Sequence, residues 1–520
     1  MYHRWLMTVI LLLFATICAL AAPPVKPYEA ETWTTPPNGV DAHVDAALKA
    51  QGATWRNPCS DEVFIRRVHL DLIGTMPKPD EVEEFLKNPR PDKRAALIES
   101  LFTRDEYADY WSMKWCDILR VKSEFPINLW PNAVQAYHQW IRAALRDNMP
   151  YDQFARALLT SSGSNFRVPP VNFYRAVPNR APDGLAAATA LTFMGTRLDT
   201  WPPAKREAMA AFFSKVAYKK TGEWKEEIVY LNPAMTEPVK ALLPDGTTAM
   251  IPGNADPRET FANWLISPKN PWFARAIVNR QWAWTMGHGI IHEPDDLRAA
   301  NPPVSPQLLA YLEAELVRAR YDLRHTYRLI LNSRTYQQSS ITQDDEKPAL
   351  RFAHYTVRRL EAEVLIDALC WIGGQGESYS SPIPEPFTFI PKGQRTIALA
   401  DGSITSSFLA MFGRSSRDTG LATERNNQPS DTQRLYLLNS NDIQQRITRS
   451  PLLRDIIRKS KGNSQEVARN IYLTLLSRYP TPQELLVLQQ YAKKPDMQPQ
   501  SVLVDTTWAL INSKEFLYRH

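Results

Sequence analysis

Apolar side chains recur every three or four residues along most of the chain, which is the spacing of amphipathic helices. The pattern is clear from Ser60, a favoured N-cap residue that two acids follow in the first helical turn. Its segments end near Pro, Gly or Asn, residues that terminate helices. In the first half of the chain the pattern predicts helices within 80–87, 92–102, 106–121, 133–147 and 151–161.

The pattern changes in the middle of the chain, where short runs of strand-forming residues replace the helical spacing. Segments 226–233 and 237–253 are predicted strands, and the second folds back on itself at the turn 244–246. Helical spacing then returns, is interrupted by an irregular stretch rich in Ser, Pro and Gly at 374–430, and resumes from Thr432. The sequence therefore predicts a mainly α fold: two helical lobes joined by a small β insert, with an irregular segment in the C-terminal lobe.

The N-terminus has the pattern of a secretory signal peptide. Arg4 precedes an apolar run at 6–14 and a small-residue cleavage site at 19–21. The run is shorter than the ~20 residues that cross a bilayer, and no later segment is apolar enough to do so. We therefore expect a mature chain without a membrane span, located in the periplasm or at the cell surface. The predicted division is a signal peptide at 1–21, a tether at 22–58, an N-terminal helical domain at 59–222, a β insert or linker at 223–256 and a C-terminal helical domain at 257–520.

The composition of the chain excludes some classes of function. The formal net charge is +6, and the basic residues are dispersed, which excludes the basic stripe of a nucleic-acid-binding protein. Outside the leader, Cys59, Cys116 and Cys370 allow at most one internal disulfide, and the sequence leaves the pairing open. The many Trp residues, among them Trp111 and Trp282, lie in helical patterns and are predicted to be core residues.

The chain contains an internal repeat. Segment 66–82 aligns without a gap with 469–485, and both copies end a helix, turn, and start another helix. His69 and Asp71 in the first copy would suit an acid–base pair, but the second copy has Tyr and Thr in their places. The repeat therefore indicates a structural role for this pair.

Several motifs resemble a known family. FIRRVHLDLIGTMPKPDEVEEFL, WCDILRV and NRQWAWTMGHGIIHEPDDLR, in this order, are similar to the planctomycete and verrucomicrobial cytochrome-associated domain pair, whose PSCyt-type and PSD-type halves have no known activity. The resemblance covers about 40–215 and 257–510. It implies an exported bacterial protein that is often encoded near c-type cytochrome-like and sulfatase-like proteins. The candidate partners are these exported proteins or a polysaccharide.

The resemblance also raises a question of cofactor. In many relatives the segment between the F-[LM]-G and A-A-F-F motifs carries Cys-x-x-Cys-His, which attaches haem c. Here the corresponding interior, 196–209, has neither Cys nor His. Covalent haem c needs two thiols and a His ligand, so we predict no covalent haem c and no bound organic cofactor, and the sequence leaves the metal content open. We expect Trp201 to fill the space.

The densest group of reactive side chains lies in the Gly-punctuated loop 288–298. Its candidate catalytic residues are His288, His292, Asp295, Asp296 and Arg298. Two imidazoles and a carboxylate suit zinc, so His288, His292 and Asp296 are candidate metal ligands. The spacing matches no closed metal motif. The alternative is an ordered loop whose acids cap the next helix and pair with Arg280 or Arg298.

A second polar cluster follows residue 411. It consists of Arg414, Arg417, Asp418, Glu424, Asn426 and Arg434. Forked guanidinium groups and amides could hold a carboxylate, a sulfate or a sugar. The alternative is a buried salt-bridge network that pins the irregular segment between the lobes. Separately, Asp117 and Arg120 are expected to pair on one helix face.

The sequence has no Gly-x-Ser-x-Gly elbow, phosphate-binding loop or dinucleotide fingerprint, and it does not decide whether the protein is an enzyme. The favoured hypothesis is an exported bacterial protein that acts as a non-catalytic binding or scaffolding component of a periplasmic or cell-surface system. The alternative is a polysaccharide hydrolase or lyase, metal-dependent or not, with its site at 288–298.

Overall fold

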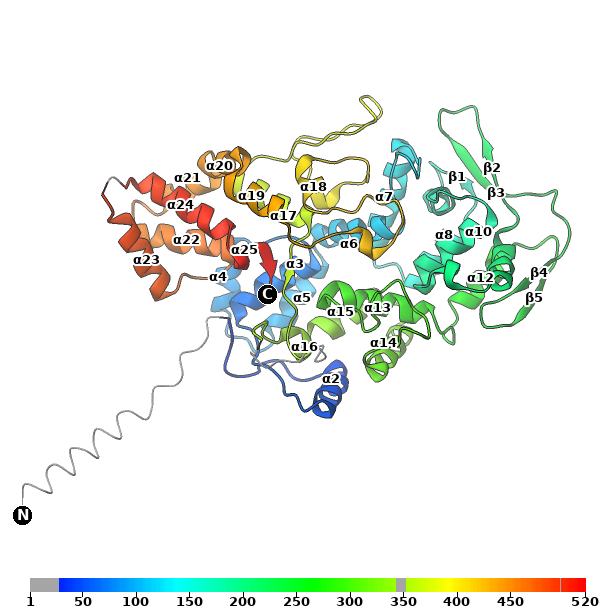
Figure 1. The fold of residues 1–520 in the computed structure, drawn as a ribbon, viewed down its shortest axis with the longest axis horizontal. Coiled ribbons are helices and arrows are strands. Elements are labelled where there is room, and N and C mark those ends of the chain that lie inside the picture. Colours follow the sequence, from blue (N-terminus) through cyan, green and yellow to red (C-terminus); the bar gives the residue numbers. More distant parts are fainter. Residues whose placement is uncertain (1–27, 343–351, 496) are drawn as a thin grey trace, which may run out of the picture.

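The structure, a computed structural model, describes residues 28–342, 352–495 and 497–520 (Figure 1). Helices dominate it and the few sheets are small, which confirms the predicted mainly α fold. The predicted signal peptide lies outside the described residues. Within the described ranges, no helix combines the length and the hydropathy needed to cross a membrane.

Helices fill both halves of the chain. The first half contains α2 (Gly39–Ala50), α3 (Asp61–Leu72), α4 (Pro79–Lys87), α5 (Lys93–Phe102), α6 (Asp105–Ile118), α7 (Pro131–Arg146), α8 (Tyr151–Thr160), α9 (Asn172–Arg175), α10 (Pro182–Thr189) and α11 (Pro203–Ala210). The second half contains α12 (Pro257–Leu265), α13 (Phe273–Met286), α14 (Pro306–Arg318), α15 (Leu323–Leu331), α16 (Arg334–Gln337), α17 (Ala362–Gly373), α18 (Ser407–Met411), α19 (Asp431–Asn439), α20 (Asn441–Thr448), α21 (Pro451–Lys459), α22 (Ser464–Leu476), α23 (Pro482–Ala492), α24 (Pro499–Ile511) and α25 (Lys514–Leu517).

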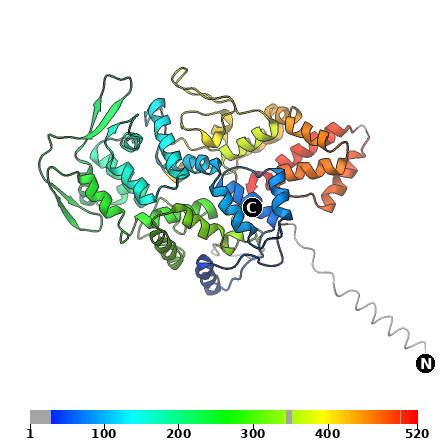
Figure 2. The same cartoon turned by 180° about the vertical axis from the view of Figure 1, so that it is seen from behind.

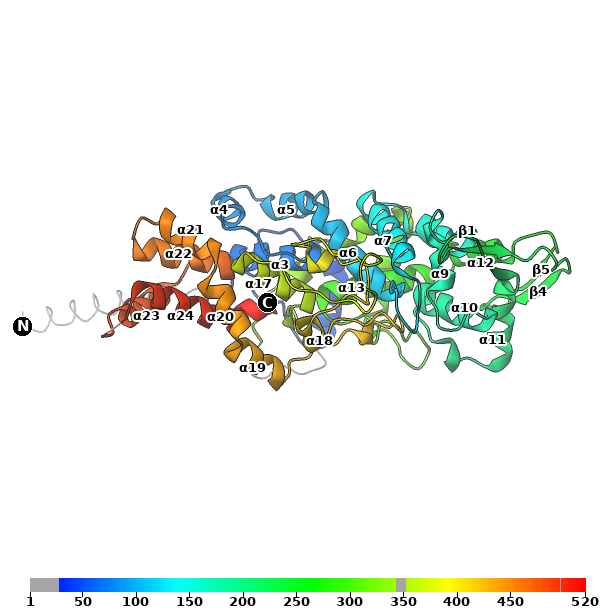
Figure 3. The same ribbon diagram turned by 90° about the horizontal axis from the view of Figure 1, so that it is seen from above.

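The molecule is elongated. In Figure 1 the helices α21 to α24 form one end and the strands β1 to β5 with α8, α10 and α12 form the other, and Figures 2 and 3 show the same order from behind and from above. Elements from the two halves of the chain pack together between these ends, α2 against α14 and α5 against α15, and also at the second end, α8 against α12. The middle of the molecule is therefore built jointly by both halves.

The strands are β1 (Gly163–Ser164), β2 (Val216–Lys220), β3 (Glu227–Leu231), β4 (Val239–Leu242), β5 (Thr248–Ile251), β6 (Arg358–Arg359) and β7 (Tyr518–Arg519). The sheet β1–β3–β2 is antiparallel, and β4 and β5 form the hairpin predicted at 244–246, with Leu242 opposite Thr248. Two strands, β1 and β2, precede the predicted insert at 223–256. The Ala-rich helical pattern before β2 masked the short alternation of Val216 and Tyr218, which marks this strand.

The two copies of the internal repeat are in contact. Ser60 caps α3 as predicted, with its hydroxyl accepting from the Val63 amide at 3.3 Å. Helix α4 of the first copy packs against α22 of the second. Buried Arg66 donates to the carbonyl oxygens of Leu475 and Phe516, each at 2.9 Å. The repeat is therefore a packing unit that joins the two halves of the chain.

The segment before α3 is fixed to the rest of the fold. The carboxylate of Asp41 in α2 accepts from the backbone amides of Arg334 and Thr335, at 3.0 and 2.9 Å. Trp111 and Trp282 are buried as predicted. The three described cysteines are all free thiols.

Candidate functional site

Five carboxylates and seven basic side chains gather around one pocket between α6, α13 and α17. We refer to these residues as the charge network: Asp71, Asp117, Asp295, Glu361 and Glu363, with Lys114, Arg280, Arg358, Arg414, Arg417, Arg425 and Arg519. The side chains are at most 18% exposed, so these charges are held away from bulk water. Burying them without partners would be costly. The pairing within the network therefore decides what the pocket can bind.

Asp71 lies at one end of the network, at the end of α3. It accepts from the hydroxyls of Tyr336 and Tyr355 at 2.9 and 2.7 Å, and from the guanidinium groups of Arg358 and Arg519 at 2.9 and 3.2 Å. Every lone-pair direction of the carboxylate is used. These four bonds give Asp71 a structural role, which is the role that the repeat indicated.

Glu361 lies in the middle of the network, just before α17. It accepts from the Lys114 ammonium at 2.6 Å and from Arg519. Burial alone would raise the pKa of Glu361, but the positive charges of Arg519 and Lys114 outweigh it and hold the pKa well below its usual value. The carboxylate is therefore ionised at neutral pH.

Asp117 binds the irregular segment to α6. Its carboxylate pairs with Arg417 at 3.0 Å and with Arg425 at 2.7 Å, and Arg425 continues to Glu363 at 2.5 Å. The predicted pairing of Asp117 with Arg120 is wrong. Helix α6 ends at Ile118, so Arg120 lies beyond the helix and donates instead to the Thr419 carbonyl at 2.9 Å.

The predicted polar cluster divides between the network and the surface. Arg414 and Arg417 belong to the charge network, which pins the irregular segment to α6 and α17. Asp418 pairs with Lys122 at 2.5 Å, and Glu424 accepts from the Asp418 amide at 2.8 Å. The two remaining members lie at the surface: exposed Asn426, and Arg434, which pairs with exposed Asp431.

The residues of the loop 288–298 also lie in different surroundings, some buried and some near the surface. Asp295 is buried, pairs with Arg280 at 2.8 Å and accepts from the Ala422 amide at 2.6 Å. Asp296 and Arg298 pair at 3.1 Å toward the surface.

The two imidazoles of that loop stay together, with the His288 and His292 ring centroids 5.4 Å apart and His292 3.5 Å from the Glu293 carboxylate. Across the described residues, however, no three His, Cys, Asp or Glu side chains are placed to share a metal ion. His288, His292 and Asp296 are therefore not arranged as a three-ligand site.

The charge network encloses a pocket of about 300 Å³. Its rim contains His292 and Glu293 from the candidate loop, and Trp284 lines it from α13. The basic lining residues are Lys114, Arg280, Arg358, Arg359, Arg425 and Arg519, against the acids Asp117, Glu293 and Glu361. Cations therefore exceed carboxylates in the wall, which favours binding of an anion. We call this cavity the charged pocket.

Several residues of the charged pocket were not predicted from the sequence. Lys114, Glu361 and Arg519 line the charged pocket but lie in segments far apart along the chain. The only local signal was Lys114, a lysine inside the otherwise apolar pattern WSMKWC. A charge at a buried helical position needs a partner, and that partner could not be identified before the fold was known.

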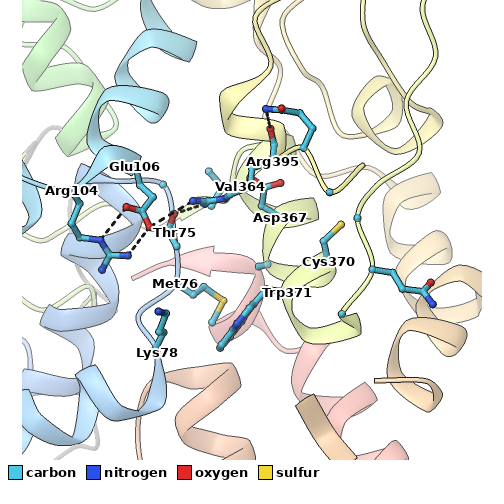
Figure 4. Close-up of a pocket in the computed structure, with 17 residues that line it drawn as sticks. Thr75, Met76, Lys78, Arg104, Glu106, Val364, Asp367, Cys370, Trp371 and Arg395 are labelled. Carbon is cyan, nitrogen blue, oxygen red and sulfur yellow. Dashed lines mark hydrogen bonds and ion pairs between the residues drawn. The ribbon is translucent and has the colours of Figure 1, made fainter. Parts of the chain in front are cut away.

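A second pocket, of about 360 Å³, lies between the α3–α4 turn and α17 (Figure 4). Arg395 donates to the Thr75 hydroxyl at 2.6 Å, and the Asp367 carboxylate accepts from the Thr396 amide at 2.7 Å. Burial raises the pKa of Asp367. Trp371 lies beside Met76 in the wall. These polar groups bond to one another across the pocket, so they join the segments that line it.

A third cavity, of about 630 Å³, lies at the segment 196–209 where relatives carry the haem motif. Trp201 does not fill it. The indole donates to the Thr196 hydroxyl at 3.3 Å, and its ring lies 6.3 Å from that of Trp272. The lining residues include neither Cys nor His, so this cavity does not fit haem c.

Comparison with known proteins gives two family matches that together span most of the chain. The family PSCyt2, described as a protein of unknown function (DUF1549), matches residues 39–216. The family PSD1, described as a protein of unknown function (DUF1553), matches residues 257–492. No curated protein and no solved structure matches the chain.

Proposed function

Because the chain belongs to the paired PSCyt2 and PSD1 families, whose function is unknown, we propose its role from its own geometry. It is an exported binding protein whose charged pocket holds the anionic group, a carboxylate or a sulfate, of its ligand. The predicted signal peptide supports export. The sulfatase-like partners that the resemblance implies would act on ligands of the same anionic class.

The observation that carries this proposal is the excess of buried positive charge. Seven cations of the charge network face five carboxylates, and Arg359 adds another guanidinium to the pocket wall. The Nε atoms of Arg358, Arg359 and Arg519 have no hydrogen-bond partner among the described residues. A buried cation without a counter-charge is costly. An anion in the pocket would supply both the charge and the acceptors.

The state of the carboxylates favours binding over catalysis. Burial raises and neighbouring arginines lower the pKa of Glu363 and of Asp117, and the arginines prevail, as they do at Glu361. A general acid needs a proton to donate near neutral pH. These three carboxylates have none, and their oxygens are already engaged by Arg and Lys.

Inorganic sulfate is the probe for this proposal, with binding measured by calorimetry. Asn427 lines the charged pocket, and Asn427→Asp adds a negative charge without removing a network partner. We expect sulfate affinity to fall at least roughly tenfold, because one added charge opposes the anion directly. The matched control is Asn426→Asp, the same change one residue away on the exposed surface. Equal sulfate binding by both variants, or none by the wild type, contradicts the proposal.

One observation supports a second function, a lyase acting on acidic polysaccharide. His292 lies at the rim of the charged pocket beside Glu293, so its imidazole could remove the proton next to a carboxylate that the arginines neutralise. The electron pair then forms the C=C bond as the glycosidic C–O bond at the β carbon breaks, and the leaving oxygen takes a proton from water. The test is the ultraviolet absorbance of unsaturated uronate after incubation with polyglucuronate. Product from the wild type and none from His292→Ala would support the lyase, whereas no product from either leaves the binding protein.

A further inference from the structure

The 630 Å³ cavity is lined by α10, by the segment 196–209 with part of α11, and by Asp418 and Thr419. We propose that it is a second ligand site, in which Arg120 binds the carboxylate of a small molecule that also carries hydroxyl or ammonium donors. We call it the Arg120 cavity. Its volume lies within the range of roughly 300–1,000 Å³ that small-molecule pockets occupy.

Arg120 is the reason to expect a ligand. The residue is 3% exposed and lines the cavity. Its Nε donates to the Thr419 carbonyl at 2.9 Å, but within the described ranges its Nη1 has no acceptor. Burial lowers its pKa to about 10, which still leaves the guanidinium charged at neutral pH. A buried cation with a free donor thus borders the largest of the three cavities described above.

Gly420 holds the segment above this guanidinium. At this position a Cβ atom would lie 2.9 Å from Cζ of Arg120 and 2.7 Å from the Ile118 carbonyl oxygen. Its φ of +76° is also in the region that favours glycine. The close approach of Gly420 and the bond to Thr419 cover one side of the guanidinium. A ligand can therefore reach Arg120 from the cavity side.

The mouth of the cavity has the opposite charge. Exposed Asp183, Asp199 and Glu207 line it together with one exposed cation, Arg206, so the acids are in excess there. Carboxylates only accept hydrogen bonds when ionised, so they suit hydroxyl or ammonium groups. A ligand with a carboxylate at its inner end and donors at its outer end satisfies both regions. Acidic sugars and amino acids share this chemistry.

The Arg120 cavity is separate from the charged pocket. Asp418 and Thr419 line the cavity, whereas Leu421 and Arg425, a few residues on, line the pocket. Gly420, which lies between these residues, packs against the Arg120 guanidinium. Variants that line only one of the two cavities therefore distinguish the sites.

Calorimetry with glucuronate, glutamate and glucose tests the proposal. We expect one of the two acids, glucuronate or glutamate, to bind, and the one that binds identifies the class of ligand. Glucose, which has no carboxylate, should bind at least roughly tenfold more weakly. Arg120→Met should lower the affinity of the binding acid roughly tenfold to a hundredfold, which is the loss expected for a charged hydrogen bond. The thermal midpoint of the free protein should fall modestly, because the variant loses the bond to the Thr419 carbonyl and the attraction of Glu424 and Asp295.

The matched control is Arg320→Met. Arg320 is exposed, lies outside the cavity, and has a φ of 53° against 56° for Arg120, so the change tests the same backbone conformation. If Arg120→Met does not fold, Ala187→Phe blocks the cavity from α10 and should abolish binding. Binding of neither acid, or unchanged binding in the foldable variant, overturns the proposal. So does binding that Asn427→Asp removes and Arg120→Met does not, since it then belongs to the charged pocket.

Discussion

Asp117 offers the sharpest test of the charge network, because one carboxylate holds two arginines from a distant segment. It accepts from Nε of Arg417 at 3.0 Å and from Nε and Nη2 of Arg425 at 3.1 and 2.7 Å. Asp117→Asn keeps the shape but removes the charge. Each charged hydrogen bond contributes about 1.5–3 kcal/mol, and breaking a buried ion pair costs about 3–5 kcal/mol. The amide oxygen of the variant can still accept part of these hydrogen bonds. We therefore expect the free energy of unfolding to fall by about 3–5 kcal/mol, the cost of a broken buried ion pair.

Urea unfolding followed by tryptophan fluorescence measures this loss. Arginine charges hold the pKa of Asp117 below its usual value against the effect of burial, so its stabilisation is present at neutral pH. It is lost as the pH falls through the folded-state pKa, and wild type and variant should converge there. The control is Asp431→Asn, whose side chain is 91% exposed and should show no measurable loss. A loss below about 1 kcal/mol for Asp117→Asn would refute the stabilising role of the network.

Two further predictions concern buried titratable groups. Burial lowers the pKa of His138 to about 3 and of His69 and His520 to about 4. Stability should therefore be complete above pH ~6.5 and fall toward pH ~4 as only the unfolded chain gains protons, and His138→Gln should reduce this slope in urea titrations. Burial also raises the pKa of Cys116 and Cys370 to about 12. A chromogenic disulfide reagent should thus label the thiols slowly in the folded protein and rapidly after unfolding.

Local signals in the sequence predicted the helices and the β4–β5 hairpin. Ser60 caps α3 because its hydroxyl bonds within one turn, and the turn at 244–246 needs only its own residues. Such interactions involve only residues that are close together in the sequence. Strand β2 was missed because its pairing with β3 depends on residues that follow a separate loop.

The candidate site was predicted only in part. Asp295 and Arg417 stood out because they belong to polar runs, and both lie in the charge network. Lys114 and Glu361 lie instead in apolar helical patterns, and they pair across 247 residues of sequence. The loop 288–298 was predicted as one unit, but its members divide between the network and the surface. Which charges meet is decided by packing of the two halves, and single-sequence spacing does not encode it.

The bond between Asp71 and Arg519 joins residues 448 positions apart. A contact between residues so far apart in sequence requires a large loop to close. It forms late in folding because closing the loop costs chain entropy before the contact stabilises the structure. A chain emerging from a ribosome or a membrane channel would hold Asp71 and the arginines of the network apart until nearly all of it had passed. The order of synthesis thus delays burial of these charges, and a polypeptide cut short would present them to proteases instead of enclosing them.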